Sequence, residues 1–262
     1  MTMTPALIEQ LGDELYQALT QRQVLEPLTN RYADITIEDA YAIQQKMLAR
    51  RLAAGEKVVG KKIGVTSQAV MNMLGVFQPD FGWLTDAMVY NEGQAIPMSR
   101  LIQPKAEGEI AFVLKKTLQG PGVTAADVLR ATDCVVPCFE IVDSRIQDWK
   151  IKIQDTVADN ASCGVFVLGD KLVDPKKVDL ALCGMVLEKN GEIVVTGAGA
   201  ATMASPVNAM VWLANTLGRL GIGLNAGDIV LSGALGAMVP VQAGDSLRCT
   251  IGGIGGCSVR FI

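Results

Sequence analysis

Apolar and polar positions follow two different periods along this chain. In the first third, residues 40–48 repeat with helical spacing behind a capping box at residues 36–39. Gly55 is placed to end that helix, and a second, shorter helix is predicted over residues 67–74. This part of the chain, residues 1–75, is therefore predicted to form a small, mainly helical lobe.

From about residue 84 the pattern changes to short apolar runs separated by glycine-rich turns. Asn190-Gly191 joins two of these runs and is typical of a β-hairpin. One long helix interrupts them, with Ser205 as its N-cap and Pro206 at its first position. Strands are expected at residues 109–114, 134–142, 182–189, 192–195, 229–231, 238–241, 246–251 and 257–262.

Predicted hairpins outnumber predicted βαβ units, which favours an α+β fold. We expect residues 76–262 to form a curled, mostly antiparallel, barrel-like β core that carries the helical lobe. A turn is predicted at residues 78–82, set by Pro79 and Gly82. Half of the 262 residues are hydrophobic but only 5% are aromatic, so the core is expected to be large and aliphatic.

Charge and composition exclude several classes of protein. The net charge is −4 and basic residues form no stripe, so no nucleic-acid partner is expected. Acidic residues at positions 9, 13 and 14 are unlike a secretory signal, and no apolar run has the length of a membrane span. The six cysteines lie mostly in apolar runs, as reduced core residues do, which indicates a cytoplasmic protein. The chain has no histidine, which excludes catalytic triads and zinc sites that use one.

Three glutamates are candidate metal ligands. Glu107 and Glu109 are two residues apart on a predicted strand, so both side chains project from one face. Glu140 lies in an apolar run, where a carboxylate is costly unless it is paired or bound to a cation. The alternatives are a solvent-facing strand edge for the first two and a salt bridge from Glu140 to Arg145. We favour a site for Mg²⁺ or Mn²⁺, which prefer carboxylate oxygens.

Three further positions carry groups suited to catalysis. Either lysine of the pair Lys61-Lys62 could stabilise an enolate oxygen, although surface lysines often occur in pairs. Asp80 could transfer a proton or simply stabilise its turn. Ser162, in a polar segment between apolar runs, could hold a substrate carboxylate or cap a turn.

Five motifs together resemble a known family. The chain resembles the 2-hydroxypenta-2,4-dienoate hydratases of aromatic meta-cleavage pathways, which belong to the fumarylacetoacetate hydrolase superfamily, over nearly its whole length. The motifs are GKKIGVT (60–66), QPDFG (78–82), AEGEIA (106–111), VADNASCG (157–164) and GGIGG (252–256).

The resemblance implies a β-roll fold, a small-molecule 2-hydroxy-dienoate substrate and a hydro-lyase activity. It also implies a homo-oligomer and association with the related 4-oxalocrotonate decarboxylase. The implied site residues are Glu107, Glu109 and Glu140 as metal ligands, Lys62 as the active-site lysine, Asp80 as the proton-transferring carboxylate and Ser162 as a substrate contact.

Two alternatives come from the same superfamily. Its C–C bond hydrolases use a Glu–His pair, which a chain without histidine cannot form. Its 4-oxalocrotonate decarboxylases share most of the motifs but typically lack the aspartate of the 78–82 turn, so Asp80 favours hydration. A non-catalytic partner subunit of that decarboxylase is the third possibility. One departure is Met203-Ala204, where hydratases usually have Leu-Gly.

Overall fold

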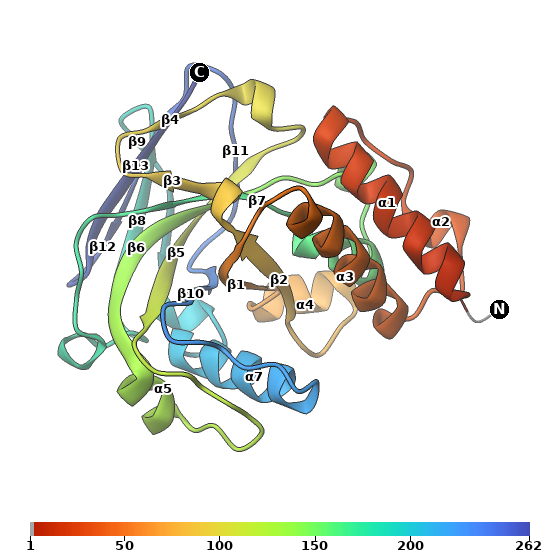
Figure 1. Cartoon of the computed structure of the whole chain (residues 1–262). Helices are drawn as coiled ribbons and strands as arrows, with labels where there is room; N and C mark the ends of the chain where they lie inside the picture. The colour runs from red at the N-terminus through yellow and green to blue at the C-terminus, as the bar shows by residue number, and fades with distance from the viewer. Residues whose placement is uncertain (1–2) are drawn as a thin grey trace.

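A computed structural model describes residues 3–262, and it divides them into a helical lobe and two β-sheets (Figure 1). The lobe contains α1 (Pro5–Gln21), α2 (Leu28–Arg31) and α3 (Ile37–Ala53). Thr36 and Asp39 form the predicted capping box at the start of α3. Leu11 and Leu15 of α1 pack with Ile43 of α3 in a separate small core.

Eight of the strands within residues 3–262 form the larger sheet. Their order is β2 (Asp80–Thr85), β1 (Val58–Gly64), β10 (Ile229–Ala234), β5 (Lys105–Leu114), β6 (Thr132–Val142), β7 (Cys163–Leu168) and β3 (Val89–Asn91), with β11 (Val239–Pro240) paired to β5. The smaller sheet has the order β4 (Ala95–Ile96), β13 (Gly255–Phe261), β12 (Ser246–Ile251), β8 (Gly184–Lys189) and β9 (Glu192–Ala198).

Four further α-helices lie within residues 3–262. The predicted cap Ser205 begins α7 (Pro206–Arg219), which packs beside α5 (Ala125–Ala131). The remaining helices are α4 (Gln68–Leu74), between β1 and β2, and α6 (Ile153–Ala158), which packs against α3. Within residues 3–262, no helix is long and apolar enough to cross a membrane.

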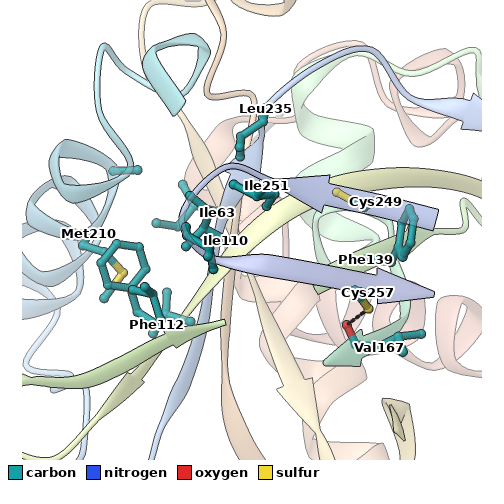
Figure 2. Packing of buried hydrophobic residues seen from close by; sticks show 14 of the residues in the cluster. Ile63, Ile110, Phe112, Phe139, Val167, Met210, Leu235, Cys249, Ile251 and Cys257 are labelled. Atoms are coloured by element: carbon teal, nitrogen blue, oxygen red, sulfur yellow. Dashed lines mark hydrogen bonds between the residues drawn. The ribbon is translucent and has the colours of Figure 1, made fainter. Parts of the chain in front are cut away.

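The main core lies between the two sheets and under α7. Figure 2 shows Ile110 of the larger sheet close to Ile251 of the smaller sheet, Phe139 close to Cys249, and Met210 of α7 beside Phe112. Gly108 permits this close approach, because a Cβ there would lie 2.5 Å from the Met185 sulfur on β8. One face of β5 and β6 is thus buried in the core, and the other face is left for the site.

The α+β fold class is confirmed, and both sheets are open. Eight of the eleven strand pairs are antiparallel; the parallel pairs are β1 with β10, β3 with β7 and β4 with β13. The predicted turn at 78–82 is partly wrong, because β2 begins at Asp80 and pairs with β1. The predicted boundary between lobe and core at residue 75 stays a prediction. The first two residues of the predicted lobe lie outside the described residues. β1, N-terminal to that division, belongs to the larger sheet.

Candidate metal and substrate site

Three carboxylates meet on neighbouring strands of the larger sheet. Glu107 on β5 is paired directly with Glu140 on β6. Glu109 projects from the same face as Glu107 because side chains alternate along a strand. One carboxylate oxygen from each residue lies within 4.8 Å of the others. Alternation along β5 and the pairing of β5 with β6 therefore bring the three predicted ligands together.

Two of these carboxylates, Glu109 and Glu140, have few hydrogen-bond partners for buried charged groups. Glu109 and Glu140 are 0% exposed. The Gly233 amide donates to Glu109 Oε2 at 2.8 Å, but Glu109 Oε1 and both Glu140 oxygens accept no hydrogen bond from the described chain. Burial and then the charge of Glu140 raise the pKa of Glu107 to about 7 and that of Glu109 well above its ordinary value. A hard divalent cation with oxygen ligands fits this set.

Lys62 supplies one positive charge beside the carboxylates. It is 3% exposed, and its Nζ lies 3.3 Å from Glu140 Oε1 and donates to the Ala161 carbonyl at 2.8 Å. Burial acts to lower the pKa of Lys62, but the charges of Glu140 and Asp80 together raise it above its ordinary value. The lysine is therefore held protonated.

The neighbouring Lys61 has a different environment. Its Nζ donates to Asp228 Oδ2 at 3.0 Å and lies 4.9 Å from the centre of the Trp83 ring. Both lysines are nearly fully buried, so the alternative of a surface lysine pair is wrong.

Asp80 approaches the same lysine across a glycine. It is 2% exposed, its Oδ1 accepts no hydrogen bond from the described chain, and burial raises its pKa. A Cβ on Gly64 would lie 2.3 Å from Asp80 Oδ1 and 3.0 Å from Lys62 Nζ. Asp80 and Lys62 therefore converge over Gly64, where any larger residue would separate them.

Ser162 lies in a tight turn beside these groups. The turn comprises residues 160–162, and its middle carbonyl, on Ala161, is the one that accepts from Lys62. Ser162 is 3% exposed, and its hydroxyl lies 3.1 Å from the Thr156 hydroxyl. The structure thus brings the turn, Lys62 and Glu140 together.

The alternative prediction for Glu140, a salt bridge to Arg145, is wrong. Arg145 pairs with Asp159 instead, at 2.5 Å.

Residues 59–262 match the family described as fumarylacetoacetate (FAA) hydrolase C-terminal. The chain belongs to the fumarylacetoacetate hydrolase family. This confirms the resemblance found in the sequence.

Several relatives within this family are hydratases by name. The chain is 71% identical to a 2-hydroxypent-2,4-dienoate hydratase of Pseudomonas putida, covering 84% of this chain and 100% of the relative. It is 57% identical to a 2-hydroxyhexa-2,4-dienoate hydratase of Comamonas testosteroni, covering 97% of each. Among solved structures, it matches 4-oxalocrotonate decarboxylase from Pseudomonas putida G7, complexed with magnesium and adipate, with a TM-score of 0.97 and 38% identity over 100% of this chain and 99% of that chain.

The helical lobe contributes two residues that the sequence did not indicate. Tyr41 of α3 stacks on Phe81 with ring centroids 4.5 Å apart, and burial, followed by the charge of Asp80, raises the pKa of its hydroxyl. Gln44, one turn further along α3, donates to the carbonyls of Phe81 and Val157. Both positions looked like ordinary helix residues, because their partners lie on strands and helices distant in sequence.

Proposed function

We propose that this member of the fumarylacetoacetate hydrolase family is a divalent-metal-dependent hydro-lyase. It adds water to 2-hydroxypenta-2,4-dienoate to give 4-hydroxy-2-oxopentanoate, a step in meta-cleavage degradation of aromatic compounds. The observation that carries this proposal is the cluster of three carboxylates beside a protonated lysine and Asp80, in which buried oxygens of Glu109 and Glu140 accept no hydrogen bond. The names of the hydratase relatives support the choice of substrate.

Glu107, Glu109 and Glu140 would hold the cation, and either Mg²⁺ or Mn²⁺ suits their oxygens. When bound, such an ion supplies Lewis-acid stabilisation of negative charge on the substrate's oxygens. The three carboxylates carry more charge than one divalent ion. Lys62 offsets the excess, which explains why a lysine is buried beside Glu140.

We assign Lys62 to stabilise the negative charge on the enolate oxygen of the substrate. An ammonium has three N–H donors. One reaches the Ala161 carbonyl and one side of the ammonium faces Glu140, which leaves a donor for the substrate. A donor fixed in this way before reaction stabilises the developing charge without reorganisation.

Asp80 is assigned to proton transfer, and Ser162 to binding of the substrate carboxylate. Ketonisation of the dienol requires a proton at C5, and addition of water at C4 requires a second proton at C3. Asp80 has an oxygen without a partner and a raised pKa, as suits a group that gives and takes protons or orients the water.

Decarboxylation of a six-carbon 2-oxo-diacid is the second candidate, favoured by the close match to the decarboxylase structure. To decide, metal-loaded protein would be supplied with each substrate and the products followed by NMR and by carbon dioxide release. Formation of 4-hydroxy-2-oxopentanoate supports the hydratase. Carbon dioxide release without hydration would replace it with the decarboxylase, and no turnover of either substrate would favour a non-catalytic partner.

The proposal also covers the cellular location and the assembly of the protein. We place the protein in the cytoplasm, because all six cysteines are buried and unpaired. We also propose a homo-oligomer that can associate with 4-oxalocrotonate decarboxylase, which size-exclusion chromatography of the protein alone and mixed with that enzyme would test.

A further inference from the structure

The turn that carries Ser162 has an unusual backbone. Asn160, Ala161 and Ser162 have φ values of 55°, 52° and 51°, so three consecutive residues other than glycine are left-handed. L-residues rarely occupy this region and almost never in succession. Such a conformation persists only where the surrounding structure holds it in place.

Arg145 provides that restraint from inside the protein. Its side chain is almost fully buried, and its guanidinium bonds to both flanks of the turn. On the leading flank, Nε donates to Asp159 Oδ1 and Nη2 to the Asp159 carbonyl, both at 2.5 Å. On the trailing flank, Nη1 donates to the Cys163 carbonyl at 2.9 Å and also to the Asp143 carbonyl. One planar group therefore closes the turn.

Other bonds fix the closed turn against the rest of the site. The side-chain amide of Asn160 accepts from the Trp83 N–H on β2 at 2.8 Å and donates to the Trp83 carbonyl at 2.9 Å. The backbone N–H of Arg145 donates to Asp159 Oδ2 at 2.9 Å, and the Ser144 hydroxyl donates to the same oxygen. The turn thus has a defined position relative to β2, which also carries Asp80.

We propose that Arg145, paired with Asp159, is a positioning residue that sets the geometry of Lys62 and Ser162. The Ala161 carbonyl, at the centre of the clamped turn, accepts from Lys62 at 2.8 Å, so displacement of the turn displaces the ammonium. This inference rests on the proposed function for the roles of Lys62 and Ser162. The clamp itself follows from the hydrogen bonds alone.

The chemistry of the clamp is consistent with positioning. A buried ion pair adds little net stability over an apolar pair of similar size, because both charges lose their hydration. The guanidinium supplies a rigid planar set of donors, which the ammonium of a lysine cannot reproduce. What Arg145 adds is therefore the fixed spacing between residues 159 and 163.

Arg145→Lys tests this proposal, because it keeps the charge and loses the planar donors. We expect kcat to fall about 100-fold, as for a small misplacement of catalytic groups. The affinity for Mn²⁺, measured by calorimetry, should change far less than kcat, because β5 and β6 carry the carboxylates that would hold the ion. Ala161→Gly in the Arg145→Lys background relieves the left-handed strain and should restore about fivefold in kcat.

Arg51→Lys is the matched control. Arg51 is 6% exposed and donates to Glu56 and Thr85, neither of which belongs to the turn or its flanks. It should lose a similar amount of thermal stability and keep its kcat. A wild-type kcat in folded Arg145→Lys would overturn the proposal, and so would a loss of activity that follows melting temperature equally in both variants.

A second variant and a second readout guard against ambiguous outcomes. If Arg145→Lys does not fold, Asp159→Glu perturbs the clamp from the other side with the charge retained, and unchanged kcat there would overturn the proposal. Hydrogen exchange tests the clamp without an activity measurement. The Ser162 N–H, bonded to the Asp159 carbonyl, and the Trp83 N–H, bonded to the Asn160 side chain, should exchange faster in the clamp variant than in Arg51→Lys. Wild-type protein that hydrates nothing would refute the proposed function, and unchanged exchange would refute the clamp.

Discussion

Replacing Glu107 with glutamine removes one of three neighbouring carboxyl groups from the metal-free protein. Glu107 is half-buried, and Glu109 and Glu140 beside it are fully buried. Burial and the charge of Glu140 raise the pKa of Glu107 from 4.5 to about 7. The substitution should therefore stabilise the metal-free fold while it destroys the metal site.

The sign and size of this effect follow from proton linkage. The folded protein holds the Glu107 proton more tightly than the unfolded chain, so wild-type stability falls as the pH rises from 4.5 to about 7. Each pKa unit corresponds to about 1.4 kcal/mol, which makes the variant more stable by about 3 kcal/mol at pH 8 and by less than about 1 kcal/mol at pH 5. The melting temperature at pH 8 should rise by roughly 5–10 °C.

Thermal melts in chelator at pH 5 and pH 8 measure this difference. Glu192→Gln, on the exposed face of β9, is the control and should change neither melt. Added Mg²⁺ should reverse the order at pH 8, because the ion binds the folded wild type and stabilises it by mass action. A variant that is less stable than wild type in chelator at pH 8, or a difference that does not depend on pH, would refute the reasoning.

Further predictions concern the groups around the carboxylates. Asp80→Asn should lower kcat by about 100-fold or more with Mn²⁺ affinity unchanged by calorimetry; an unchanged rate would remove Asp80 from the mechanism. Gly64→Ala should leave the protein folded by circular dichroism but lower kcat, since its Cβ would separate Asp80 from Lys62; full activity would show that this convergence is unimportant. Gly60→Ala should destabilise the fold by at least about 2 kcal/mol in urea unfolding, because its Cβ would lie 1.7 Å from the Ile229 carbonyl oxygen; wild-type stability would contradict the close β1–β10 pairing.

Features of the fold that depend on neighbouring residues could be predicted from the sequence. The capping box before α3, the Ser205-Pro206 start of α7 and the Asn190-Gly191 hairpin are all present in the structure. β1 was not predicted as a strand of the core, because its parallel partner β10 lies about 170 residues away in the chain. Such a pairing leaves no signal in the local pattern of apolar residues.

The candidate site also has features that the local sequence predicts and others that depend on residues distant in the chain. Strand alternation placed Glu107 and Glu109 on one face, and the cost of burying a carboxylate singled out Glu140. The sequence alone left open which lysine reaches the site. The strand register answers this, because Lys62 is paired with Gly82 and Lys61 with Trp83, and the two lysines therefore project from opposite faces of β1. The partner of Arg145 could not be read from the sequence, since a loop of irregular backbone brings Asp159 to it.

The most direct test follows the ultraviolet absorbance of 2-hydroxypenta-2,4-dienoate with chelator-treated protein, before and after addition of Mg²⁺ or Mn²⁺. The account predicts no decay without metal and rapid decay with it, with 4-hydroxy-2-oxopentanoate as product, and no recovery in Glu107→Gln. Folded wild-type protein that leaves the dienol unchanged with either metal, or that hydrates it equally well in chelator, would contradict the account.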